Sequence, residues 1–141
     1  MIERFEDLLA WQKGRELCRE IYRVTKEGSF ARDFALRDQI RKAAISIPSN
    51  IAEGFERFRL SEFHQFLSIA KASAAEVRTQ IYLASDIGYI DDETRTTLLI
   101  GATKTSQVIA ALRTSVERRM TTTKHEGRST KHVARSTKDE V

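Results

Sequence analysis

Residues 98–116 read LLIGATKTSQVIAALRTSV, and this stretch decides the fold. Its apolar and small residues recur alternately four and three positions apart, at Leu98, Ala102, Thr105, Ile109, Leu112 and Val116. A helix that packs on other helices has this spacing, whereas a strand would repeat every two residues. The stretch therefore predicts an α-helix with one buried seam.

Three earlier segments carry similar seams. In the third segment the seam is Phe63, Leu67, Ala70, Ala74, Val77, Ile81 and Ala84, and in the second it is Ile40, Ala44, Ile47, Ile51, Gly54 and Phe58. The first segment combines Ala10, Gly14, Leu17, Ile21 and Val24 with a neighbouring row of Leu8, Trp11, Cys18 and Tyr22. The small residues in these seams imply that the helices approach one another closely.

Turn and capping residues separate the four segments. Asp91 is expected to cap the last helix, and Ser61 the third, because their side chains can accept hydrogen bonds from free N–H groups at a helix start. We expect helices at about 5–27, 33–58, 61–87 and 92–119. Because the connections are short, neighbouring helices must run antiparallel. The predicted fold class is all-α, an antiparallel up-down-up-down four-helix bundle.

A chain of 141 residues has room for one domain. We assign the bundle to residues 1–120. Residues 121–141 hold too few apolar side chains to offset the entropy of ordering, so we expect a disordered, basic C-terminal tail there.

The composition limits the partners and the cellular location that we expect for the protein. The chain has 24 basic and 20 acidic side chains, a mild excess that makes polyanions plausible partners. No stretch approaches the roughly 18 apolar residues of a membrane span. The single cysteine, Cys18, cannot form an internal disulfide. We expect a cytoplasmic protein without membrane contact.

The least ordinary stretch of the chain is SIPSNIAEG, residues 46–54. Pro48 lacks an N–H group and its ring crowds the carbonyl of Ala44, which predicts a kink. Asn50 can set helix register, and Glu53 can pair with Arg57 one turn later. A structural role is favoured for this stretch, and a ligand or partner contact is the alternative. Its signature residues are Ser46, Pro48, Asn50, Glu53 and Gly54.

Several motifs in the same order along the chain resemble a bacterial family. They are Phe5-Glu6-Asp7-Leu8, Trp11-Gln12-Lys13, Gln39-Ile40-Arg41-Lys42-Ala43-Ala44, the signature stretch, Ser61-Glu62-Phe63 and Gly88-Tyr89-Ile90. The family is that of proteins encoded by intervening sequences of 23S ribosomal RNA genes, often called S23 ribosomal proteins. The accessory protein of diversity-generating retroelements is similar to it.

The resemblance implies an antiparallel four-helix bundle that assembles into a homopentamer. It also implies a basic surface suspected of binding nucleic acid, and no assigned catalysis. Glu56 departs from the family pattern, a Gly-x-Gly-Arg motif, and places negative charge beside Arg57 and Arg59. This departure argues against a polyanion site at that turn.

No catalytic pattern is present: we find no nucleophile with a base, no metal cluster and no phosphate-binding glycine loop. Cys18 and His64 lie on different segments, and His125 and His132 lie in the expected tail. We therefore predict no enzyme activity, no metal, no cofactor and no small-molecule substrate.

The predicted nucleic-acid contacts are basic residues of the first two helices. Arg15, Arg19 and Arg23 are spaced four apart, and the second helix adds Arg37, Arg41 and Lys42. They could contact the phosphates of RNA or DNA. Glu16 and Glu20, three residues before Arg19 and Arg23, could instead neutralise part of this row. The alternative is a structural or adaptor protein, in which exposed aromatic residues such as Trp11, Phe55 and Phe58 serve subunit or partner contacts.

Overall fold

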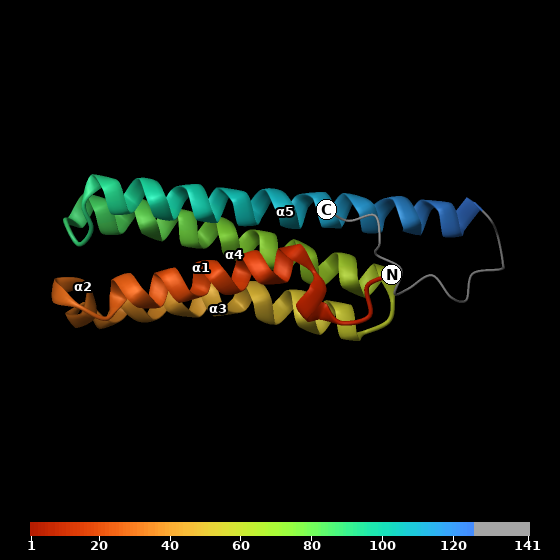
Figure 1. The fold of residues 1–141 in the computed structure, drawn as a ribbon, viewed down its shortest axis with the longest axis horizontal. Coiled ribbons are helices and arrows are strands. Elements are labelled where there is room, and N and C mark those ends of the chain that lie inside the picture. Colours follow the sequence, from red (N-terminus) through yellow and green to blue (C-terminus); the bar gives the residue numbers. More distant parts are fainter. Residues whose placement is uncertain (126–141) are drawn as a thin grey trace.

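Four long helices lie side by side in the computed structural model, which describes residues 1–125 (Figure 1). They are α1 (Leu9–Thr25), α3 (Phe34–Glu56), α4 (Leu60–Ile87) and α5 (Asp92–His125). A 3-10 turn, η1 (Phe5–Asp7), precedes α1, and a short helix, α2 (Gly28–Arg32), precedes α3. α3 packs on α1 and α4, and α5 packs on α4 and α1. The predicted fold class, an antiparallel four-helix bundle, is confirmed for the described residues.

The core consists of the seams that the spacing predicts. In α5, Leu98, Ala102, Thr105, Ile109, Leu112 and Val116 are each at most 3% exposed. Two aromatic assignments were wrong, the exposure of Phe55 and the place of Phe58 in the seam; the exposure expected of Phe58 in the adaptor alternative is confirmed. Phe55, expected at the surface, is buried and meets Phe63 edge to face at 5.8 Å between ring centroids. Phe58, expected in the seam, is 57% exposed because α3 ends at Glu56.

The N-terminal helix begins later than residue 5. Leu8 has an extended backbone (φ −73°, ψ 127°) that separates η1 from α1. The break buries the Leu8 side chain completely and brings the Phe5 ring 5.4 Å from the Trp11 ring. Burial of these apolar side chains outweighs one additional helical turn.

Other helix ends follow local chemistry. Asp91 accepts a hydrogen bond from the Thr94 N–H at 2.8 Å, as expected of a cap. Ser61 is not the cap of α4, because that helix already begins at Leu60. α5 continues to His125, so residues 121–125 are helical rather than part of a tail. The predicted disorder of residues 126–141 lies outside the described residues.

One polar cluster joins the start of α3 to the turn between α4 and α5. Asp33 caps α3 by accepting from the Leu36 N–H at 3.0 Å, and its other oxygen accepts from the Tyr89 hydroxyl at 2.7 Å. The Tyr89 ring stacks on Phe30 at 5.2 Å. The hydrogen bonds from Leu36 and Tyr89 hold the pKa of Asp33 below 3.8, and the bond to Asp33 raises the pKa of Tyr89 above 10.0.

This cluster makes stability depend on pH at both extremes. The lowered pKa of Asp33 means that its contribution is present above pH 3.8 and lost as pH falls through the folded-state pKa. The raised pKa of Tyr89 means that its contribution is present below pH 10.0 and lost as pH rises. We expect Asp33→Asn to be less stable than wild type at neutral pH and to lose less stability on acidification. Urea unfolding across pH measures both. Tyr89→Phe should remove the alkaline loss and, because it also removes the hydrogen bond to Asp33, part of the acid loss. An unchanged acid slope in Asp33→Asn would contradict the assignment.

Candidate nucleic-acid interface

Guanidinium groups lie over aromatic rings along the outer side of α1 and α3. Arg41 of α3 reaches across to α1, where its Nε donates to Thr25 Oγ1 at 2.8 Å and its guanidinium lies 4.4 Å from the Tyr22 ring centroid. On α1 itself, Arg15 lies 5.5 Å from the ring centroid of Trp11. Each ring attracts the cation and leaves its positive charge intact. The outer side of α1 and α3 is thus a surface of ordered positive charge.

The three arginines of α1 do not form a straight row. Each step of four residues advances about 40° beyond a full helical turn, so the row winds around the helix. Arg23 ends beside Glu20, whose carboxylate lies 2.7 Å from the guanidinium and raises the pKa of Arg23. Arg19 is exposed and has no ion pair among the described residues. Of the two expected acidic partners, Glu20 is confirmed, whereas Glu16 pairs with Lys13 at 3.6 Å.

The basic residues of α3 separate into two groups. Arg37 lies one turn before Arg41, but it is half-buried: it pairs with Asp38 at 2.9 Å and donates to the Ala31 carbonyl of α2 at 3.0 Å. Lys42 is exposed and lies one turn before Ser46, which faces α4. The structure therefore brings Arg41 to α1, holds Arg37 against α2 and leaves Lys42 away from both.

The signature stretch holds α3 against both of its neighbours. Ser46 Oγ lies 2.9 Å from Ser73 Oγ on α4, and Asn50 Nδ2 donates to the Ser46 carbonyl at 2.7 Å. A Cβ added at Gly54 would lie 2.6 Å from Phe66 Cβ on α4, so only glycine fits this approach.

The remaining signature residues face other neighbours. A Cβ added at Gly14 of α1 would lie 3.4 Å from Pro48 Cδ, so Pro48 packs beside that glycine. Glu53 pairs with Arg57 at 3.0 Å, as predicted. α3 is one continuous helix through Pro48. The kink at Pro48 stays a prediction.

The comparison with protein families agrees with these contacts. The family model described as 23S rRNA-intervening sequence protein matches residues 6–111. The chain belongs to this family. The matched range begins in η1 and ends within α5, so it includes both helices of the arginine surface and the whole signature stretch. A search of curated proteins found no similar sequence.

This 23S rRNA-intervening sequence family member shows no metal centre in the part that the structure describes. No three His, Cys, Asp or Glu side chains gather there in a way that could hold an ion. Burial raises the pKa of the Cys18 thiol, which makes it a poorer nucleophile at neutral pH. Among the same residues, no helix has both the length and the apolar character to cross a membrane.

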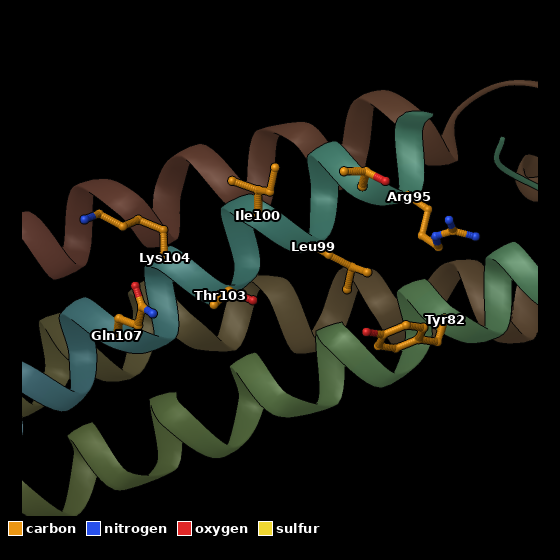
Figure 2. Close-up of a pocket in the computed structure, with 8 residues that line it drawn as sticks. Tyr82, Arg95, Leu99, Ile100, Thr103, Lys104 and Gln107 are labelled. Atoms are coloured by element: carbon orange, nitrogen blue, oxygen red, sulfur yellow. The ribbon is translucent and has the colours of Figure 1, made fainter. Parts of the chain in front are cut away.

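Sequence reasoning missed a groove between α4 and α5. Figure 2 shows Leu99 pointing from α5 toward Tyr82 on α4, with Arg95 beside them and Lys104 further along α5. The groove is shallow and has a volume of about 670 Å³. The charges of α5 could have indicated this groove. From Arg95 onward, the helix has one acidic residue, Glu117, and six basic residues. These are Arg95, Lys104, Arg113, Arg118, Arg119 and Lys124.

Proposed function

We propose that this 23S rRNA-intervening sequence family protein is a non-catalytic bundle that assembles with copies of itself and binds structured RNA in the cytoplasm. The RNA surface is the outer side of α1 and α3. A homopentamer is the assembly that the family resemblance implies. Self-assembly is supported by large apolar side chains that are exposed on α4 and α5, among them Ile69, Tyr82, Leu83, Ile87 and Ile100.

One observation carries the RNA proposal, the ordered arginine–aromatic surface. Arg15 and Tyr22 are seven residues apart, so they lie on one face of α1, and Arg41 joins this face from α3. Arg19 adds an exposed charge without an ion pair among the described residues. Cations held in place on a helix face suit phosphates of fixed spacing, as on an A-form RNA helix. Several copies in one assembly would add their weak contacts through avidity.

Salt dependence tests this proposal. The full chain and a variant without residues 126–141 are titrated into a labelled RNA hairpin at several salt concentrations. We expect binding in both forms, with log K falling by about 0.7 to 0.9 per phosphate contact for each unit of log salt, hence a slope steeper than about −2. Absence of binding, or binding that disappears with residues 126–141, would contradict an RNA site on α1 and α3.

A structural or adaptor role is the second candidate function. The observation that favours it is charge compensation, because Arg23 and Arg37 already have carboxylate partners in their own chain. Exposed ion pairs of this kind contribute little to stability and are ordinary on solvated helix faces. In that case the outer side of α1 and α3 would contact another subunit or a protein rather than RNA.

A further inference from the structure

Two outward faces of the bundle have opposite charge and share apolar character. The first is the groove described above, hereafter the basic groove, formed by Tyr82, Arg95, Leu99, Ile100, Thr103 and Lys104. Tyr82 is 52% exposed and Ile100 is 66% exposed. Figure 2 shows Ile100 and Lys104 on the side of α5 opposite Leu99, so this face extends from the groove across the outward surface of α5. Nothing in the described part of the chain covers it.

The second face is a row on α4, hereafter the acidic row, formed by Ile69, Glu76, Leu83 and Ile87. All four side chains are exposed, the three apolar ones by 45–55%. The row lies toward α3, since Ser73, which bonds to α3, is one turn from both Ile69 and Glu76. It contains one carboxylate, Glu76, and no basic residue. The basic groove lies on the α5 side of the same helix.

Glu76 of the acidic row and Lys104 of the basic groove lie at nearly the same height along the bundle. Contacts between α4 and α5 set the register: Arg95 donates to Ser85 at 3.2 Å, Arg113 donates to Ser68 at 3.4 Å, and His64 lies 2.7 Å from Glu117. In this antiparallel register, Lys104 is level with Val77, beside Glu76. Arg95 is level with Asp86, but Asp86 lies on the α5 side of α4, about five full turns from Ser68, and Arg95 pairs with Asp92 of its own chain at 3.1 Å.

We propose that the basic groove of one copy receives the acidic row of a second copy. This inference specifies the contact for the self-assembly proposed above and does not depend on RNA binding. In a ring whose axis is parallel to the helices, copies are related by rotation without a shift along the axis. Glu76 of one copy then meets Lys104 of the next. Leu83 lies near the level of Leu99, and Ile87 is level with Thr94.

The contact is head-to-tail, because each copy uses a different face on its two sides. Such heterologous contacts form closed rings when the rotation divides a full turn. A second copy fits better than RNA, because the apolar centre of the basic groove needs an apolar partner and RNA would leave the acidic row uncovered. The charge pair of Glu76 with Lys104 also favours one register of the two copies.

Charge reversal tests the pairing directly. Full-length Lys104→Glu, Glu76→Lys and the double variant are compared with wild type by sedimentation over a range of protein concentrations. Each single reversal places like charges opposite one another, so we expect the dissociation constant of the assembly to rise about tenfold or more. The double variant restores opposite charges and should return to within about threefold of wild type. Arg19→Glu makes the same charge change on α1 and should leave the mass unchanged.

Each possible failure has its own meaning. If the full-length protein is a monomer at every concentration, both this contact and the proposed self-assembly are overturned. If it assembles but the single reversals keep the wild-type mass, or the double variant does not recover, only this contact is overturned. If Lys104→Glu weakens binding to the RNA hairpin and leaves the mass unchanged, the basic groove is a polyanion site instead. Circular dichroism confirms that each variant is folded, which is expected since both positions are exposed.

Discussion

Replacing Gly54 by valine should lower the free energy of unfolding by about 3 kcal/mol, the upper range for overpacking a core. At this position α3 and α4 approach so closely that even a Cβ would lie 2.6 Å from Phe66 Cβ and 3.1 Å from Phe63 Cδ1. Phe63 is 2% exposed and packs on Phe55, so its ring has no space to move into. The two helices must separate, and the contacts on both sides of Gly54 weaken.

Gly101→Ala is the matched control for this prediction. Gly101 also lies within a helix, but no atom lies within 4 Å of the Cβ that alanine would add. Alanine loses less backbone entropy than glycine on folding, so this variant should gain up to about 1 kcal/mol. Urea unfolding at one fixed protein concentration compares the two, because assembly makes stability depend on concentration. If the Gly54→Val protein is as stable as wild type, the close packing of α3 against α4 at this position does not contribute to stability.

Changing Arg15, Arg19 and Arg23 together to glutamate should lower the affinity for an RNA hairpin about 100-fold at low salt. Each lost phosphate contact corresponds to about 1 kcal/mol at the protein surface, and three contacts to about 3 kcal/mol. The slope of log K against log salt should become shallower by about two, since fewer counterions are released. Fluorescence anisotropy with the labelled hairpin measures both quantities.

Two controls separate charge from geometry in this experiment. Replacing the same three residues by lysine keeps the charge but weakens the stacking of Arg15 on Trp11, so most of the salt slope should remain. Sedimentation of the glutamate variant shows whether assembly is intact. If the glutamate variant binds RNA normally, or loses assembly instead, the outer side of α1 and α3 serves subunit contacts, as in the structural or adaptor role.

Several features of the fold and the site could be predicted because they depend on residues close in the chain. The seam of α5, the cap at Asp91 and the pair of Glu53 with Arg57 all follow from spacings of three or four residues. Helix ends were less accurate, as at Leu8, where burial of an apolar side chain interrupts a sequence that continues the helical pattern. Phe55 was assigned to the surface because the rotation of α3 relative to α4 is not apparent in one segment alone.

The candidate RNA surface was predicted in part. The arginines of α1 could be found from their spacing, and so could the pair of Arg23 with Glu20. The stacking of Arg15 on Trp11 and the lack of a partner for Arg19 among the described residues could not. The stacking of Arg41 on Tyr22 joins residues on two helices, and its detection requires knowing which helices are neighbours. The basic groove was missed for the same reason, since Tyr82 comes from α4 and Leu99 from α5.

The amino-acid sequence by itself determined that this chain forms four helices and which side of each is buried, because helical periodicity and capping act within a few residues. It also determined the family, since the motifs occur in order along the chain. Only the tertiary structure decided that Gly54 lies against Phe66 and that Arg41 lies over Tyr22. It also placed Arg95 level with Asp86, and Lys104 beside the level of Glu76. These relations depend on how the helices pack and on their register. Both are determined jointly by side chains that are distant in the sequence.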